Sequence, residues 1–154
     1  MVLGYLNQEI KNKKIFLVWA DIRQFGFLKL IDESELNQIV SEYGPEPLDV
    51  SAKVLAERLN RSSTRSIKAT LLDQAIIAGI GNIYADESLH RAGIRPHRCV
   101  AHLSLVERLR LAQEIQNVLQ ESINQQGTSA NDYVDTQGQK GGFLNLLRVY
   151  GRAG

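Results

Sequence analysis

The chain has 154 residues, 44% of them hydrophobic and 23% charged, with a formal net charge of +1. This is ordinary for a globular protein of one medium or two small domains, and the near-neutral charge alone gives no case for a nucleic-acid partner. Cys99 is the only cysteine, which excludes an internal disulfide and a cysteine-rich zinc site. Because there is no secretory signal pattern and no apolar run near the roughly 20 residues that span a bilayer, we expect a cytoplasmic protein.

Two short strands are predicted near the amino terminus, at residues 14–19 and 26–31, which are rich in β-branched and aromatic residues. The residues between them would form a hairpin tip with Arg23 and Phe25 on the same side, because side chains alternate along an extended chain. A cation and an aromatic ring on an exposed tip suit insertion into a stack of bases. The alternative is a core phenylalanine beside a surface arginine, which composition alone favours.

Helices are predicted over the rest of the chain. Residues 34–43 form the first and end at Gly44-Pro45-Glu46-Pro47, a strong breaker that we interpret as a domain junction. Three more follow at residues 51–59, 67–78 and 82–92, the last of which ends at Gly93.

The longest helix is predicted to begin at Ser104, whose spacing to Glu107 is that of a capping box, and to end near Gly127. Its predicted core face comprises Leu105, Leu109, Ala112, Ile115, Leu119 and Ile123.

The most informative feature is the turn between the third and fourth predicted helices. Gly79 and Gly81 can adopt turn geometry that other residues resist, and Asn82 can cap the next helix with its side chain. This arrangement leaves bare backbone amides at the positive end of a helix, which is a ready phosphate site. Because a Gly-x-Gly pair is a weak motif, a purely structural corner remains the alternative.

Charge is concentrated around this turn, since residues 58–98 carry seven basic and three acidic side chains, a local balance of +4. The basic residues are Arg58, Arg61, Arg65, Lys68, Arg91, Arg95 and Arg98. A basic patch here favours phosphate contact, and a solvated helical surface is the alternative.

A polar, glycine-rich loop follows at residues 128–142, and a last ordered segment is predicted at residues 143–150. The loop could fold over a polar ligand such as an extruded base, or it could be a plain connector. The three histidines, His90, His97 and His102, show no metal-ligand spacing, and no activated serine or cysteine nucleophile is visible.

Together these residues resemble the formamidopyrimidine-DNA glycosylases, bacterial repair enzymes that excise oxidised purines and then nick the abasic site by β,δ-elimination. The similarity extends from about Lys14 to Arg152, and its most specific motif is Ile80-Gly81-Asn82-Ile83-Tyr84-Ala85-Asp86-Glu87. The further matching segments are Asp21-Ile22-Arg23-Gln24-Phe25-Gly26, Gly44-Pro45-Glu46-Pro47-Leu48, residues 127–143 and Val149-Tyr150-Gly151-Arg152.

The resemblance implies roles for the matching positions. Arg23 and Phe25 would fill the space that a flipped nucleotide leaves in the duplex. The DNA backbone would be bound by Lys68, Gly81, Asn82, Tyr150 and Arg152. The loop that closes on the flipped base would include Thr128, Ser129, Asn131, Asp132 and Tyr133. The implied partner is double-stranded DNA containing oxidised purines, bound by a monomeric, nucleoid-associated protein without a membrane contact.

The same resemblance implies an α+β chain: a remnant of an amino-terminal β-sandwich at residues 1–47, then an all-helical helix–two-turn–helix DNA-binding domain at residues 48–154. The family's nucleophile is an amino-terminal proline followed by glutamate, whereas this chain begins Met1-Val2-Leu3-Gly4. The family's four-cysteine zinc finger would follow Gly154.

We therefore expect an internal fragment that keeps DNA-contact surfaces, has no catalytic residue, metal or cofactor of its own, and does not cleave DNA alone. The alternatives are a non-catalytic DNA- or RNA-binding module and a truncated chain without function.

Overall fold

The computed structural model describes residues 2–10, 13–21, 26, 28–62, 64–128 and 141–151, and for residues 2–10, 13–21 and 62 it describes the backbone alone. By contacts the chain divides into two units, Met1–Asn37 and Gln38–Gly154, and each is described here by itself. The domain boundary predicted after residue 47 stays a prediction. Among the described residues, no helix has the length and apolar character needed to cross a membrane.

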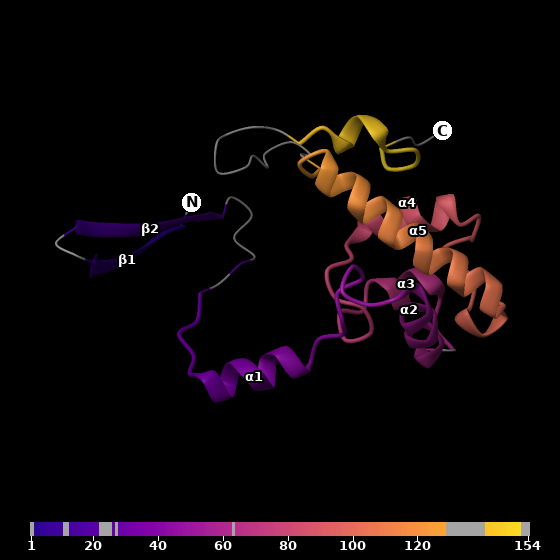
Figure 1. Cartoon of the computed structure of the whole chain (residues 1–154), viewed down its shortest axis with the longest axis horizontal. Helices are drawn as coiled ribbons and strands as arrows, with labels where there is room; N and C mark the ends of the chain where they lie inside the picture. The colour runs from indigo at the N-terminus through magenta and orange to yellow at the C-terminus, as the bar shows by residue number, and fades with distance from the viewer. Residues whose placement is uncertain are drawn as a thin grey trace. The chain divides into compact units, whose positions relative to one another are not determined.

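The first unit contains one antiparallel pair of strands, β1 (Val2–Ile10) and β2 (Lys13–Asp21), shown in Figure 1. Their register places Val2 opposite Asp21 and Ile10 opposite Lys13. The strand predicted at residues 14–19 is confirmed within β2, and β1 was not predicted.

The strand predicted at residues 26–31 is wrong, because Gly26 and residues 28–31 have no regular structure. The ladder of β2 is formed with β1 instead, and Leu30 is 99% exposed. The hairpin tip that this strand would have completed is therefore not supported, and Arg23 and Phe25 lie outside the described residues. A helix, α1 (Glu33–Ser41), follows and confirms the prediction for residues 34–43.

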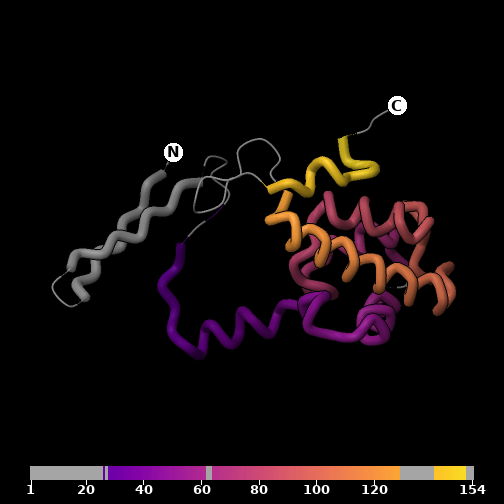
Figure 2. The backbone as a smooth tube through the Cα atoms, turned by 45° about the horizontal axis from the view of Figure 1, so that its top comes forward, coloured from indigo at the N-terminus to yellow at the C-terminus, as the bar shows by residue number. Residues whose placement is uncertain are grey.

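The second unit is helical. It contains α2 (Ala52–Leu59), α3 (Ile67–Leu71), α4 (Asn82–Arg91) and α5 (Leu105–Asn124). Short 3-10 helices lie at Asn60–Ser62, Val100–His102 and Phe143–Leu146. Helix α5 packs against both α2 and α4, as Figures 1 and 2 show. Their facing side chains form the main core, and removing this apolar surface from water stabilises the unit.

Local signals in the sequence place the helix ends. The Ser51 hydroxyl accepts from the Val54 amide at the start of α2, and α4 ends before Gly93, whose φ is +65°. At the start of α5, Ser104 and Glu107 form the predicted capping box, with the Ser104 amide 2.8 Å from Glu107 Oε2. These contacts span four residues or fewer, and the predictions there are confirmed.

The predicted core face of α5 is correct in its middle and wrong at its ends. The buried residues of α5 are Leu111, Ala112, Ile115, Val118 and Ser122. Leu105 and Ile123 are 54% and 59% exposed, whereas Ser122 beside Ile123 is buried, so the covered face of α5 departs from the predicted one at both ends.

Acidification should weaken the start of α5. The Arg98 guanidinium and the Ser104 amide, in that order, lower the pKa of Glu107 from 4.5 to about 2. Because this pKa is lower when folded, the stabilisation is complete above pH 4.5 and is lost as the pH falls through about 2. We expect the carboxyl resonance of Glu107 to titrate near pH 2 in NMR, and Glu107→Gln to remove this part of the acid sensitivity of Tm. A titration midpoint near 4.5 would contradict this.

Candidate nucleic-acid interface

The glycine turn begins earlier than the sequence pattern predicts. Helix α3 ends at Leu71, so the helix predicted for residues 67–78 is too long. The Asp73 carbonyl accepts from the amides of Ile76 (2.9 Å) and Ile77 (3.1 Å), and the Asp73 carboxylate accepts from the Ala75 amide at 3.1 Å. In a continuing helix the Ala75 and Ile76 amides would donate to the carbonyls of Leu71 and Leu72. Here both donate to Asp73, so α3 ends and the apolar run continues as two successive turns.

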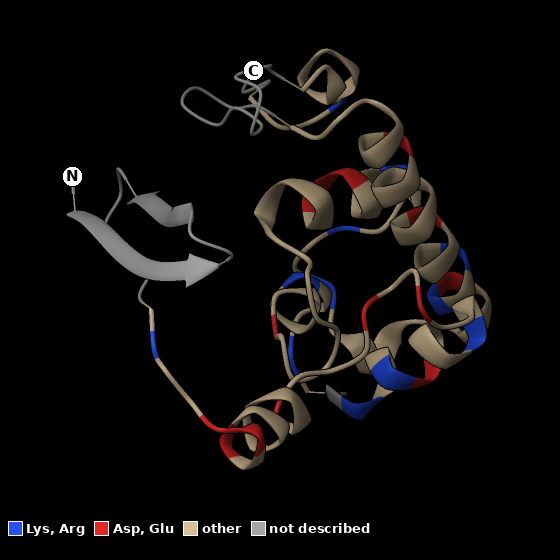
Figure 3. Cartoon of the chain, turned by 60° about the vertical axis from the view of Figure 1, so that its left-hand side comes forward, with Lys and Arg blue, Asp and Glu red and all other residues tan. Residues whose placement is uncertain are grey.

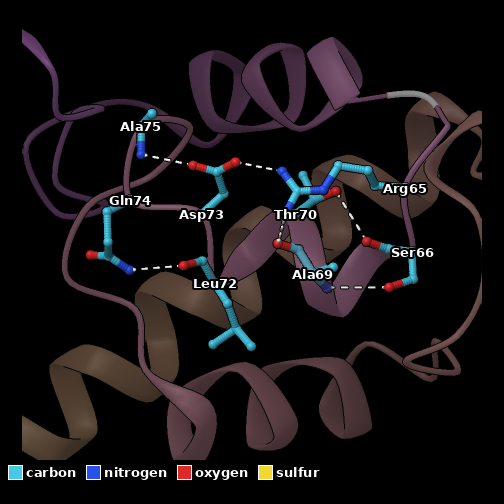
Figure 4. Close-up of polar contacts among 8 residues, drawn as sticks. All are labelled: Arg65, Ser66, Ala69, Thr70, Leu72, Asp73, Gln74 and Ala75. Atoms are coloured by element: carbon cyan, nitrogen blue, oxygen red, sulfur yellow. Dashed lines mark hydrogen bonds and ion pairs between the residues drawn. The ribbon is translucent and has the colours of Figure 1, made fainter.

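The Asp73 carboxylate is itself held by Arg65, as Figure 4 shows. The hydrogen bond from Arg65, followed by that from the Ala75 amide, lowers the pKa of Asp73 below its ordinary value. The first of the two turns is therefore anchored by an ionised carboxylate.

Gln74 crosses the turn. Its side-chain amide donates to the carbonyls of Leu72 (3.3 Å) and Ile80 (3.0 Å). Its side-chain oxygen accepts from the Gly79 amide at 2.8 Å. Both sides of the turn are thus joined through one half-buried side chain, for which the local sequence gives no clear signal.

The Gly44-Pro45 segment lies against the same turn. The Gly44 amide donates to the Gln74 carbonyl at 2.8 Å, and the Ala78 amide donates to the Pro45 carbonyl at 3.1 Å. A Cβ on Gly44 would lie 2.4 Å from the Ile76 carbonyl oxygen, so the approach requires glycine. This segment, which we interpreted as a junction from the sequence, therefore supports the turn.

The amino end of α4 is open. Gly79 has a φ of +79°, as the turn requires, and Gly81 is the N-cap residue without a side-chain cap. The prediction that Asn82 caps this helix is wrong, since Asn82 is its first residue and is exposed. The first turn of α4 carries no acidic residue, and apart from the adjoining residues no atom of the described part of the chain lies within 4 Å of the Cβ position of Gly81. Such a helix end has amides and a positive dipole available for an anion.

Lys68 is brought to the same helix. It lies in α3, and its Nζ is 2.7 and 2.8 Å from the two carboxylate oxygens of Asp86 in α4. The two side chains are 32% and 22% exposed. The sequence analysis did not predict this pairing.

Tyr150 is also connected to α4, through Glu87. The Glu87 side chain is fully buried and accepts from the amides of Arg148 (2.9 Å), Val149 (2.8 Å) and Tyr150 (3.1 Å). Burial opposes ionisation of this carboxyl, but the three amides outweigh it and lower the pKa of Glu87 below its ordinary value. The sequence offered one signal for this site: Glu87 follows Ile83 by four residues, so its carboxylate lies on the same, inward face of the helix as an apolar side chain.

The base of the polar loop is attached to α4 as well. Thr128 pairs with Gly142 in an isolated bridge, and the Thr128 hydroxyl is 3.1 Å from the Tyr84 hydroxyl. The Tyr84 ring contacts Phe143, with 6.2 Å between ring centroids. Ser129, Asn131, Asp132, Tyr133 and Arg152, which we predicted to contact DNA, lie outside the described residues.

The predicted basic patch is largely compensated. Four of its seven basic side chains form ion pairs, which are Arg65–Asp73, Lys68–Asp86, Arg91–Glu121 and Arg98–Glu107. Basic and acidic segments accordingly alternate over the helices in Figure 3. Surface charge alone therefore does not define the interface. Within the described ranges, no group of three or more histidine, cysteine, aspartate or glutamate residues could hold a metal ion.

Comparison with known proteins gives one consistent result. A family model described as the formamidopyrimidine-DNA glycosylase H2TH domain matches residues 43–133. Curated proteins named formamidopyrimidine-DNA glycosylase are similar over most of this chain. That of Nitratidesulfovibrio vulgaris is 49% identical over 90% of this chain and 38% of its own length. That of Desulfitobacterium hafniense is 48% identical over 88% of this chain and 51% of its own. The chain thus spans about half, or less, of the length of these relatives.

Solved structures agree. The MutM (Fpg) protein of Thermus thermophilus superposes with a TM-score of 0.77 at 33% identity, over 99% of this chain and 62% of that one. Lactococcus lactis Fpg in complex with DNA containing an abasic site gives 0.76 at 34% identity, over 90% and 53%. MutM bound to DNA containing carbocyclic 8-oxo-G gives 0.77 at 31% identity, over 98% and 60%.

Proposed function

The chain belongs to the formamidopyrimidine-DNA glycosylase family, and from that premise we propose that it binds the sugar-phosphate backbone of damaged double-stranded DNA for base-excision repair. One observation carries the proposal: three predicted phosphate ligands are attached to α4 within six positions. Asn82 begins the helix, Lys68 pairs with Asp86, and the Tyr150 amide bonds to Glu87. A single rigid helix can therefore position all three residues against the phosphates of one DNA strand.

The physical basis is phosphate recognition by a helix end. Amides at the open amino end of α4 would donate to phosphate oxygens, and the dipole of the helix favours the negative charge. Lys68 would add a cation that displaces counterions from the DNA. Thr128, which precedes the polar loop, is attached to Tyr84 in the same helix.

For the whole protein we propose the family's reaction, in which oxidised purines are removed by N-glycosidic cleavage and the abasic site is nicked. Two of the solved relatives support damaged DNA as substrate, since they were bound to DNA containing an abasic site or carbocyclic 8-oxo-G. We assign cleavage to no described residue of this chain. One cysteine cannot form the family's four-cysteine zinc site, so no step is assigned to zinc either.

We also propose that β1 and β2 belong to the β-sandwich of the family's catalytic domain, within residues 1–47, and that residues 48–154 are the DNA-binding domain. The antiparallel pairing of the two strands is consistent with such a sheet.

Asn82→Asp should separate binding from stability. A carboxylate in the first turn of α4 interacts favourably with the helix dipole, so the free energy of unfolding should rise by about 0.3–1 kcal/mol. The same carboxylate would repel a phosphate, and we expect the affinity for duplex DNA to fall at least about tenfold, by analogy with charged contacts. Fluorescence anisotropy with a 15-base-pair duplex containing a central tetrahydrofuran lesion measures this at 50 mM salt.

Asn124→Asp is the matched control, because it makes the same charge change at the exposed far end of α5 and keeps the oxygen that accepts from Gln120. Its affinity should equal that of the unmodified chain. Equal binding by Asn82→Asp would refute the proposed site. Stronger binding to an RNA hairpin than to the damaged duplex would favour an RNA-binding module instead.

A further inference from the structure

The ion pair between Lys68 and Asp86 differs in its contacts from two of the other pairs. Asp73 and Glu107 accept from backbone amides of a turn and a helix cap as well as from arginine. The Asp86 carboxylate instead places both of its oxygens on the Lys68 ammonium, at 2.7 and 2.8 Å. The helix dipole favours a carboxylate within the first turn of a helix, whereas Asp86 is the fifth residue of α4 and lies beyond that turn. Its main electrostatic partner in the structure is therefore a predicted phosphate ligand.

Both side chains are accessible to a competing anion, since Lys68 is 32% and Asp86 22% exposed. A carboxylate presents two oxygens to an ammonium much as a phosphodiester presents its two non-bridging oxygens. The lysine ammonium is a compact charge on a flexible stem, so it can move from one anion to another with little change in the backbone.

We propose that Asp86 is an intramolecular competitor for the DNA phosphate, which occupies Lys68 in the free protein and weakens backbone binding at this site. This inference rests on the proposed function, because it takes Lys68 to be a phosphate ligand. It adds an acidic residue to the site that acts against binding, so Asp86 sets the affinity of the site through Lys68.

The proposed competition changes how DNA affinity depends on salt concentration. When Lys68 neutralises a phosphate, about 0.9 condensed cation leaves the DNA. When Lys68 leaves Asp86, the unpaired carboxylate attracts a cation near the DNA. The net number of cations released by the Lys68 contact is then close to zero. Without the carboxylate this compensation disappears, and the release from the Lys68 contact becomes visible.

Asp86→Asn should therefore strengthen binding. We expect the affinity of the 154-residue chain for the tetrahydrofuran duplex to rise about three- to fivefold at 50 mM salt, the range of an exposed ion pair. The slope of log affinity against log salt, measured from 25 to 200 mM, should become steeper by about 0.9. A variant that fails to fold would bind DNA less tightly, so misfolding cannot explain an increase in affinity.

Two further variants identify the cause. Lys68→Met in the Asp86→Asn background should abolish both the gain and the steeper slope. Glu57→Gln, which makes the same charge change at an exposed position of α2, should leave affinity and slope unchanged. A similar gain in Glu57→Gln would assign the effect to net charge and overturn the inference.

The remaining outcomes separate the two proposals. If the unmodified chain binds the damaged duplex and Asp86→Asn binds equally or more weakly, Asp86 only joins α3 to α4 and the inference fails alone. If the unmodified chain shows no salt-dependent binding to the duplex, the proposed function fails and the inference fails with it.

Discussion

Replacing Glu87 with glutamine should release the segment that carries Tyr150 while leaving the helical core folded. The carboxylate accepts from three consecutive backbone amides in a fully buried site. Glutamine keeps one accepting oxygen but turns an NH₂ group toward the amide donors, which then lose a partner. We expect the free energy of unfolding to fall by about 2–4 kcal/mol.

Hydrogen exchange gives the local readout for this variant. The amides of Arg148, Val149 and Tyr150 should lose protection, whereas the amides of α5 should keep it. For hydrogen exchange alone, Asp86→Asn is the matched control, because it removes the neighbouring charge without removing a bond to these amides. Duplex affinity should fall about tenfold in Glu87→Gln, since a displaced Tyr150 would lose its proposed phosphate contact. Unchanged protection at these three amides would show that Glu87 does not hold the segment.

The lowered pKa of Glu87 predicts that the stability of the fold depends on pH. Because the pKa of Glu87 lies below its ordinary value of 4.5 in the folded chain, its stabilisation is complete above pH 4.5 and is lost as the pH falls below that value. Glu87→Gln should lack this contribution, so the stability difference between variant and unmodified chain should shrink on acidification.

Gly44→Ala should distort the glycine turn from the outside. The added Cβ would lie 2.4 Å from the Ile76 carbonyl oxygen and 2.9 Å from the Ile77 amide nitrogen. Both atoms belong to the backbone of the turn, so relief requires the turn itself to move. We expect the free energy of unfolding to fall by about 1–3 kcal/mol, the usual cost of overpacking. Chemical denaturation measures this loss.

Binding should weaken as well in Gly44→Ala, because the turn leads into the amino end of α4. Gly142→Ala is the control for a glycine substitution in general, since the nearest atom to its Cβ would be the flexible Gln125 Oε1 at 3.3 Å. Its effect on stability should be small. A Gly44→Ala chain as stable as the unmodified one would show that the Gly44-Pro45 segment does not support the turn.

Features decided by neighbouring residues could be predicted from the sequence. The capping box at Ser104, the start of α2 next to Ser51 and the end of α4 at Gly93 depend on contacts within four residues, and the structure has them where expected. The middle of the core face of α5 followed from its apolar period. The errors at the two ends of that face arose because an apolar period does not show which positions the neighbouring elements cover: Ser122 is buried and Ile123 is exposed.

The candidate site mixes both kinds of information. The glycine turn and its open helix end were visible as Gly79-Ile80-Gly81-Asn82, and the family match at residues 43–133 confirms the domain that they indicated. The exact cap was mispredicted, since Asn82 was expected in the place that Gly81 occupies. Asparagine and glycine are both good N-cap residues, so local preference could not decide between them.

The sequence by itself determined most of the helical elements and the glycine turn, because each depends on residues close together in the chain. It also identified the family, through motifs that keep their order along the chain. Only the tertiary structure decided how the site is held and charged. Lys68 meets Asp86 across 18 residues, and Glu87 meets the Tyr150 segment across 61 to 63 residues. Such contacts depend on how α3, α4 and the carboxyl-terminal segment pack, and this packing cannot be predicted from the conformational preferences of neighbouring residues. For that reason the sequence indicated a basic phosphate site, whereas the structure shows a lysine already paired with an internal carboxylate.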